Sequence, residues 1–168
     1  MDLRQAGRDE LYNIAVFLDD CWREVYRHIV SDEFLDSMSS DERHKSVIKR
    51  YDEGASDFVV LFDNESLVGA AVYGKSFTGG YENDGEISAI YLRKDYIGRG
   101  YGHSLIVKIE QALSDKGYTH FVLAVLSENT RALNFYLDHG YEKVADRTIR
   151  IGENEYPLTV LRKSALFE

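Results

Sequence analysis

A glycine-rich turn stands between two stretches that are expected to be regular secondary structure. The stretch Glu86–Leu92 alternates and is rich in β-branched and aromatic residues, which is typical of a half-buried strand. The turn Gly98–Gly102 follows, and apolar residues then recur at helical spacing from about Gly102 to Lys116. The first backbone N–H groups of a helix have no partner within it, and the positive end of the helix dipole lies behind them. The sequence therefore predicts an anion site at this turn, most often one for phosphate.

Two common phosphate-binding motifs do not fit the turn. The dinucleotide fingerprint needs a glycine three residues after its second one, where this sequence has His103 or Leu105. A Walker loop ends in Gly-Lys-Ser or Gly-Lys-Thr, and no such tripeptide closes the turn. Both motifs are excluded on spacing.

Asn129 and Tyr136 form a second pair that could do chemistry. They lie seven residues apart, and on a helix this spacing returns them to nearly the same face about two turns apart. A tyrosine hydroxyl with a pKa of about 10 is protonated at neutral pH and can donate its proton. Two readings stay open for each residue, because Asn129 could simply cap the helix and Tyr136 could simply pack in the core.

The sequence predicts neither a metal site nor a disulfide. None of the five histidines has a second histidine or a glutamate at the spacing of a helical zinc motif. Cys21 is the only cysteine, so no internal disulfide can form. It is interpreted as a small buried apolar residue, since no His/Asn signature of a catalytic cysteine surrounds it.

The remaining sequence divides into alternating strand and helix patterns without repeats or linkers. Residues 8–30 carry apolar residues at helical spacing, and a second helical segment is expected over residues 34–51. The expected strands are residues 2–5, 57–62, 67–73, 86–92, 120–126, 141–151 and 156–162, with a turn at 152–155 and a short helix between about residues 129 and 140. The loop 78–85 is expected to be mobile.

Length and composition favour one soluble domain. A chain of 168 residues with 44% apolar residues can bury one good core, so residues 1–168 are expected to form a single domain. No apolar run approaches about 18 residues and no secretory signal is present, which predicts a cytoplasmic protein that contacts no membrane. The net charge of −9 argues against nucleic acid as a partner.

Charge is distributed unevenly along the chain. Residues 93–108 hold four basic side chains against Asp95 alone, whereas the rest of the chain is acidic. This basic island coincides with the glycine-rich turn, where an anionic ligand would need it. Short charge runs are usually solvated faces, so this observation alone leaves both readings open.

The turn resembles motif A of the GNAT N-acetyltransferase superfamily. In that family a fourth strand, a Gly-x-Gly turn and the following helix bind the pyrophosphate of acetyl-coenzyme A (acetyl-CoA). The family pattern, Gln/Arg-x-x-Gly-x-Gly/Ala, falls here on Ile97–Gly102, which reads IGRGYG. Ile97 departs from the usual Gln or Arg, which puts one side-chain contact with the cofactor in doubt, while Arg99 offers charge nearby.

A second stretch resembles motif B of the same family. Residues 129–141, NTRALNFYLDHGY, match Asn-x-x-Ala-x-x-x-Tyr-x-x-x-Gly-Phe, with Tyr141 in place of Phe. The two motifs lie on the expected elements, with 27 positions from Gly102 to Asn129. Together they are far more specific than either alone, and the order of elements matches the family over essentially the whole chain.

The resemblance implies a fold, a co-substrate and a set of binding residues. The implied fold is α/β, with a mixed central sheet of about seven strands, about four helices and a splay between strands four and five. The implied co-substrate is acetyl-CoA, with no metal. The residues implied to contact it are Tyr91, Leu92, Ile97, Gly98, Arg99, Gly100, Tyr101, Gly102, His103, Asn129 and Tyr136.

The resemblance also implies catalytic roles. The family draws a donor for the developing oxyanion from a strand-four backbone N–H, for which Leu92 is the matching position. Tyr136 matches the general acid that protonates the leaving sulfur. Glu86 lies fourteen residues before Gly100, where one branch of the family has its glutamate base, although it could also be only a solvated or capping carboxylate. Glu82 and Asp84 are alternatives that could bind a cationic acceptor.

The leading hypothesis is an N-acetyltransferase that acts by direct attack of a primary amine on acetyl-CoA. The acidic surface favours a cationic acceptor, such as a small-molecule amine, a lysine or an N-terminal amine. Trp22, Tyr26 and Tyr51 could line its pocket, although aromatic residues at helical spacing are more often core. The alternatives are a non-catalytic acyl-CoA-binding or sensing module, and a protein that shares only the fold and forms subunit interfaces. Both a monomer and a homodimer are compatible with the sequence.

Overall fold

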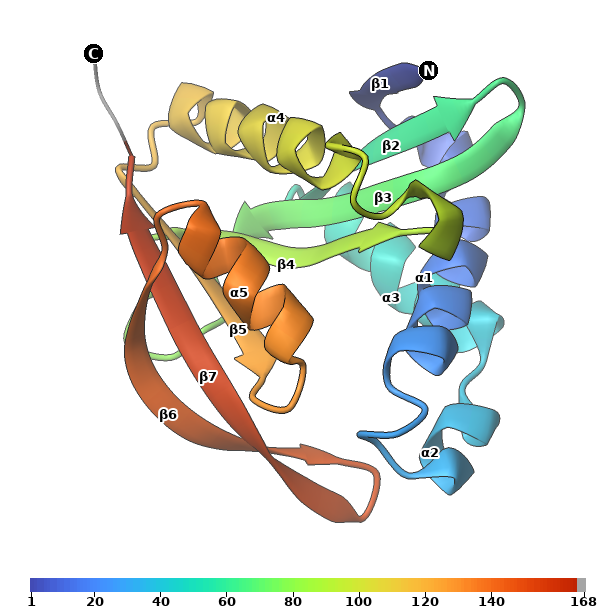
Figure 1. The fold of residues 1–168 in the computed structure, drawn as a ribbon. Helices are drawn as coiled ribbons and strands as arrows, with labels where there is room; N and C mark the ends of the chain where they lie inside the picture. The colour runs from blue at the N-terminus through green and yellow to red at the C-terminus, as the bar shows by residue number, and fades with distance from the viewer. Residues whose placement is uncertain (166–168) are drawn as a thin grey trace.

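A seven-stranded mixed sheet, in the order β1-β2-β3-β4-β5-β7-β6, forms the centre of the protein (Figure 1). The computed structural model describes residues 1–165. The strands are β1 (Asp2–Gln5), β2 (Ser56–Asp63), β3 (Ser66–Lys75), β4 (Gly85–Leu92), β5 (His120–Leu126), β6 (Glu142–Ile151) and β7 (Asn154–Ser164). The helices are α1 (Leu11–Val25), α2 (Asp32–Ser37), α3 (Ser40–Asp52), α4 (Tyr101–Asp115) and α5 (Thr130–Asp138), with 3₁₀ turns at Arg8–Glu10 and Lys94–Tyr96. This architecture confirms the predicted fold class.

The one parallel strand pair of the sheet comes apart. β4 and β5 pair through Gly85 with Phe121 and through Glu86 with Val122, and no later pair joins them among the described residues. Beyond these pairs β4 remains bonded to β3 as far as Leu92, and β5 remains bonded to β7. The predicted splay between strands four and five is therefore confirmed.

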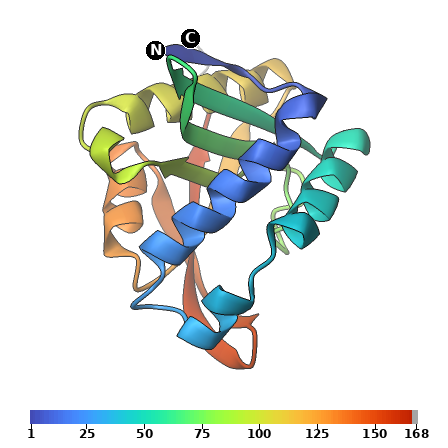
Figure 2. The ribbon, with the colours of Figure 1, turned by 90° about the vertical axis from the view of Figure 1, so that its right-hand side faces the viewer.

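Helices cover both faces of the sheet. α4 and α5 lie on one face, and α1 and α3 lie on the other, where α1 crosses the strands in front of them in Figure 2. α4 packs because its buried residues recur on one stripe, namely Leu105, Ile106, Ile109 and Leu113. The apolar run of residues 120–126 is β5, a strand as predicted. It is apolar because it lies inside the sheet, between β4 and β7, and packs against helices.

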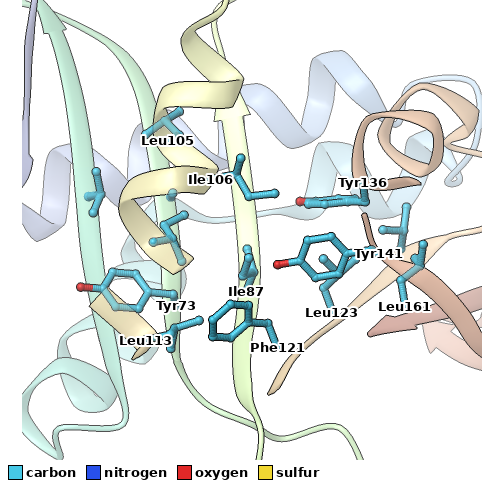
Figure 3. Packing of buried hydrophobic residues seen from close by; sticks show 14 of the residues in the cluster. Tyr73, Ile87, Leu105, Ile106, Leu113, Phe121, Leu123, Tyr136, Tyr141 and Leu161 are labelled. Atoms are coloured by element: carbon cyan, nitrogen blue, oxygen red, sulfur yellow. The ribbon is translucent and has the colours of Figure 1, made fainter. Parts of the chain in front are cut away.

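The main core lies between the sheet and the α4–α5 layer (Figure 3). Tyr73, Phe121 and Tyr141 are among its largest fully buried side chains. The ring centroids of Tyr136 and Tyr141 are 5.7 Å apart at an interplanar angle of 72°, which is the edge-to-face arrangement that aromatic pairs favour. This packing fixes α5, and with it the position of Tyr136, against β5.

A smaller cluster joins the first two helices to the far end of the β6–β7 hairpin. Tyr26, Val30, Leu35, Leu126 and Ile151 are its buried members. The backbone N–H of Ser31 donates to the Tyr156 hydroxyl at 3.0 Å, and the side chain of Phe34 packs against Gly152. This cluster connects the α1–α3 layer to the strand pair on the far side of the splay.

The N-terminal helices differ in detail from the prediction. A helix was expected from residue 8 to about Val30, but residues 8–10 form a 3₁₀ turn and α1 ends at Val25. The apolar spacing continues past this end because Tyr26 and Val30 are still buried, at 6% and 3% exposure, in a turn rather than a helix. Helical spacing alone could not reveal this end, because no Gly or Pro marks it.

Two further boundaries were predicted too coarsely. The expected helical segment 34–51 is two helices, α2 and α3, each with a serine N-cap: Ser31 accepts from Phe34 N, and Ser39 accepts from Glu42 N. The protein therefore has five α-helices among its described residues rather than about four. The turn between the last strands is shorter than expected, since β7 begins at Asn154. Within residues 1–165 no helix has both the length and the apolar character needed to cross a membrane.

Candidate functional site

The glycine-rich turn has the geometry of an anion-binding helix start. Gly98 and Gly100 have φ angles of +77° and +86°, and a Cβ at either residue would meet nothing within 4 Å. The first helical bond of α4 runs from Ser104 N to Gly100 O at 3.1 Å. The preceding N–H groups of the helix, those of residues 101–103, therefore have no partner within the helix. Left-handed glycines and free N–H groups together leave room for a ligand to approach the backbone.

Side chains around the turn contribute charge and one exposed apolar group. Arg99 is exposed, and its guanidinium lies 5.9 Å from the centroid of the Tyr96 ring. Ile97 is 36% exposed, so it fills no core position. His103 Nδ1 lies 3.1 Å from His139 Nε2, and His139 Nδ1 lies 2.7 Å from the backbone oxygen of Phe135. This histidine contact joins the start of α4 to the end of α5.

The splay leaves backbone N–H groups of β4 without a strand partner. Arg93 N donates to Val68 O of β3 at 2.8 Å. Because successive N–H groups of a strand point to opposite sides, the Leu92 N–H points away from β3 and toward the space between β4 and β5. The Ile90 N–H shares this direction. Among residues 1–165 no β5 residue pairs with this part of β4.

Three tyrosine hydroxyls and one amide gather beside this gap. The hydroxyls of Tyr26 and Tyr91 lie 3.3 Å apart, and Asn129 Nδ2 lies 3.5 Å from the Tyr26 hydroxyl. Tyr136 is 7% exposed, and none of the hydrogen bonds found among residues 1–165 involves its hydroxyl. Burial raises the pKa of Tyr91 and of Tyr136, and the nearby Tyr26 adds to both effects. The hydroxyls of Tyr91 and Tyr136 are therefore protonated at neutral pH and can donate hydrogen bonds.

Asn129 has two contacts. Its Oδ1 accepts from Ala132 N at 3.2 Å, so it caps α5 as that residue type often does. Its Nδ2 faces the Tyr26 hydroxyl. The capping contact is therefore present, and the contact of Asn129 with the cofactor stays a prediction.

Glu86 lies at the paired end of β4, away from the other predicted residues. Its Oε2 accepts four hydrogen bonds: Ser76 Oγ at 3.0 Å, Phe77 N at 2.7 Å, and Thr78 N and Oγ1 both at 3.1 Å. Leu92 lies six positions further along the strand, which corresponds to a distance of about 20 Å. Glu86 therefore holds the turn after β3, and it cannot touch an atom that also contacts the Leu92 N–H.

The two alternative carboxylates already have hydrogen-bond partners within the protein. Asp84 is 5% exposed and accepts from Arg162 Nε at 2.6 Å and Nη2 at 3.0 Å. Glu82 accepts from Gly80 N at 2.8 Å, and this backbone contact lowers the pKa of its carboxyl. The loop is also bonded to β6, through Arg147 Nη2 and Gly79 O at 2.6 Å. Its predicted mobility stays a prediction.

A cleft of about 400 Å³ lies on the other side of β4, between that strand and helices α1 and α3. Ser88, Ala89 and Tyr91 form its β4 side. Its remaining apolar lining includes Trp22, Phe34, Met38, Val47 and Phe58. Trp22 thus lines a cleft, which is one of the two readings that the sequence left open, whereas Tyr51 packs against Phe58 in the core and Tyr26 is buried.

Three charged residues in this cleft were missed by the sequence analysis. Asp19 is 1% exposed and forms an ion pair with Arg43, and Ser40 Oγ donates to it at 3.1 Å. Arg50 also lines the cleft. A signal existed, because Arg43, Val47 and Arg50 are spaced i, i+4, i+7 and so share one face of α3. No metal site accompanies them: among residues 1–165 no three His, Cys, Asp or Glu side chains are placed to hold an ion.

Comparison with known proteins identifies the family. Residues 17–141 match the acetyltransferase (GNAT) family. The chain belongs to this family. Its relatives include YuaI of Bacillus subtilis, an uncharacterized N-acetyltransferase that is 29% identical over 89% of this chain and 84% of its own. Another is the spermidine N(1)-acetyltransferase of Thermoplasma acidophilum, which is 22% identical over 87% of this chain and 90% of its own.

A solved GNAT structure has the same fold. The PaiA N-acetyltransferase of Thermoplasma acidophilum, in complex with coenzyme A, superposes with a TM-score of 0.75 over 97% of this chain and 98% of its own, at 18% identity. In the chain described here, which is itself a GNAT protein, the residues predicted to bind the cofactor fall into two groups. Residues 97–103 form the turn and the start of α4, while Tyr91, Leu92, Asn129 and Tyr136 border the splay.

The buried tyrosines make stability depend on pH in the alkaline range. The pKa values of Tyr91 and Tyr136 are raised in the folded protein, so their contribution to stability is fully present below the unfolded pKa of about 10 and is lost as pH rises. We expect Tyr91→Phe and Tyr136→Phe each to flatten the fall in the free energy of unfolding above about pH 10, by up to about 1.4 kcal/mol per pH unit. Urea unfolding of each protein at about pH 8 and about pH 11 measures this. The prediction would be contradicted if the free energy of unfolding fell by the same amount between these two pH values in variant and wild type.

Proposed function

We propose that this GNAT protein transfers an acetyl group from acetyl-CoA to a primary amine by direct attack. The observation that carries the proposal is the splay of β4 and β5, which leaves strand N–H groups facing a gap bordered by the unpaired hydroxyl of buried Tyr136. The coenzyme A complex of the PaiA structure and the spermidine acetyltransferase relative support the co-substrate and the amine class. Acetyl-CoA supplies an activated acyl group as a thioester.

The pyrophosphate is assigned to the turn at Gly98–Gly102. Open space at Gly98 and Gly100 and the free N–H groups at the start of α4 fit a phosphate that approaches the backbone. Arg99 adds positive charge beside it, in an otherwise acidic chain. The exposed Ile97 contributes no polar contact, so the backbone supplies most of the affinity.

Residues at the splay are assigned to the reacting centre. The Leu92 N–H, or the Ile90 N–H with the same direction, stabilises the negative charge that develops on the carbonyl oxygen. As the new C–N bond forms, the C–S bond breaks and the sulfur leaves with the electron pair. The Tyr136 hydroxyl then donates a hydrogen bond or its proton to this sulfur.

The acceptor amine reaches this centre from the cleft of α1, α3 and β4, whose β4 side includes Tyr91. An ammonium with a pKa of about 10 must lose a proton before its nitrogen can attack. We assign the base to Glu86 acting through a chain of several water molecules, because it lies too far along β4 for direct contact with the reacting atoms. Its Oε1 carries none of the hydrogen bonds found among residues 1–165, which all fall on Oε2.

Calorimetric titration with acetyl-CoA is the experiment that tests this function first. Acetyl-CoA is expected to bind at micromolar concentration, while NADH and ATP serve as controls that do not. Release of free CoA thiol with a panel of primary amines then measures transfer. Folded protein without acetyl-CoA affinity would overturn the proposal.

Gly100→Ala tests the turn, and Gly117→Ala is its matched control. Both glycines flank α4, with φ angles of +86° and +90°, and a Cβ at either one would meet nothing within 4 Å. Both substitutions should therefore cost similar stability, about 1–2 kcal/mol. Only Gly100→Ala should weaken acetyl-CoA binding, by at least tenfold, because its methyl group occupies the phosphate's approach. Equal affinities for the two variants would remove the turn from the binding site.

Tyr136→Phe tests the proton donor. We expect the maximal transfer rate to fall at least tenfold while acetyl-CoA affinity stays within a few-fold, because the hydroxyl acts when the sulfur leaves. Steady-state kinetics and titration of the same preparation measure the two quantities. An unchanged rate would exclude Tyr136 from the chemistry. Acetyl-CoA binding without turnover in the wild type would instead support the sensing module.

Glu86→Gln tests the base. The glutamine keeps a carbonyl oxygen that the donors of residues 76–78 can reach, but it cannot take a proton. We expect a rate at least tenfold below wild type at neutral pH, with the deficit shrinking as pH approaches the pKa of the amine, where free amine needs no base. The pH profile of the maximal rate checks this. A deficit that is constant with pH would show that Glu86 serves only to hold the turn.

A further inference from the structure

Arg50 brings a positive charge into the cleft without a matching negative partner. Its Nε donates to Ser56 Oγ at 2.9 Å, whereas its Nη2 is buried and has no hydrogen-bond partner among residues 1–165. Among residues 1–165 no carboxylate forms an ion pair with it. A buried donor without a partner is costly, so this guanidinium gains from a ligand that accepts a hydrogen bond from it.

Arg50 is half-buried beneath an exposed aromatic side chain. The ring of Phe77 lies over it, with the guanidinium carbon 4.2 Å from the ring centroid. Burial lowers the pKa of Arg50, and the negative charge of Glu86 partly opposes this effect. Glu86 does not neutralise Arg50 by direct contact, since its bonded oxygen faces the 76–78 turn. An arginine remains charged in any such setting.

The other charges of the cleft already balance one another. Asp19 is buried and paired with Arg43, and its second oxygen accepts from Ser40. A buried carboxylate that is paired in this way has little left to offer an incoming cation. The cleft therefore has one spare positive charge, on Arg50, although the chain as a whole has a net charge of −9.

We propose that Arg50 binds a carboxylate of the acceptor, so that the substrate is an amino-acid-like molecule with both an amine and a carboxylate. This rests on the proposed acetyl transfer. A single spare charge matches a singly charged carboxylate, which the planar guanidinium can bind through two parallel N–H bonds. The aromatic wall formed by Trp22 and Phe34 suits an apolar body between or beside the two charged groups. Arg50 is thus a specificity-determining residue for the acceptor.

Matched amine pairs that differ only in a carboxylate test this proposal. Lysine is compared with cadaverine, and 6-aminohexanoate with pentylamine, because in these amino acids the reacting amine is well separated from the carboxylate. We expect kcat/KM to favour the carboxylate member of at least one pair by tenfold or more, because the guanidinium loses its directly bonded anion when the carboxylate is absent. Equal or higher values for every plain amine would overturn the proposal while leaving acetyl transfer intact.

The variants Arg50→Gln and Lys49→Gln show whether Arg50 causes the preference. Both remove one positive charge from α3, but the Lys49 side chain is 73% exposed and lies outside the cleft. The preference should disappear in Arg50→Gln, be partly kept in Arg50→Lys, and be unchanged in Lys49→Gln. Acetyl-CoA affinity, measured on the same samples, should not change in any of them. A preference that survives Arg50→Gln, or that is lost equally in Lys49→Gln, would overturn the assignment.

Product binding gives a readout that needs no turnover. Titration of the CoA-loaded protein with Nε-acetyllysine and with N-acetylcadaverine compares the same pair after acetylation. We expect the carboxylate product to bind at least tenfold more tightly to wild type and no more tightly to Arg50→Gln. Equal affinities in wild type would overturn the proposal, and this result is distinct from failure to bind acetyl-CoA, which would overturn the transferase function itself.

Discussion

The separation of two parallel strands is the constraint on which the site depends. A strand edge inside a sheet normally has its N–H and C=O groups paired, and unpaired buried groups are costly. β4 and β5 pair only through Gly85 and Glu86 and then diverge, so the rest of each facing edge must find other partners. The splay is thus a place in the sheet where a ligand's polar groups can replace a missing strand.

The rest of the fold keeps this gap open. β4 is held by β3 and by α4, while β5 is held by β7 and by the aromatic packing of α5. The cluster around Tyr26, Leu35 and Ile151 connects the α1–α3 layer to the β6–β7 hairpin across the bottom of the gap. Because β4, β5, α4 and α5 share one buried core, the strands cannot close on each other without rearranging it.

Most of the fold, but only part of the site, could be predicted from the sequence. Local signals such as the glycines of the turn and the alternation of β4 predicted the helices and strands. The resemblance of the two motifs to the family implied the splay. The end of α1 at Val25 escaped because residues after it stay buried and so keep the apolar spacing. Asp19, Arg43 and Arg50 were not predicted to belong to the site. Their side chains line a common cleft only when α1 and α3 pack against each other and against β4. The roles assigned to Glu86 and Tyr136 stay predictions, and the two residues lie far apart. Tyr136 lies beside the gap, whereas Glu86 lies about 20 Å along the strand from Leu92.

Net charge and local charge lead to different expectations for the acceptor. The acidic composition favours a cationic acceptor, but exposed charges separated by more than about 10 Å are largely screened at ordinary ionic strength. Inside the cleft the dielectric is lower, so a nearby charge has more influence there than the sum over the surface. Asp19 is neutralised by Arg43, and Arg50 is left with a desolvated, partly unbonded guanidinium. A zwitterionic acceptor fits both the net charge and the local charge. Its ammonium is attracted by the acidic surface, and its carboxylate is paired with Arg50 in the cleft.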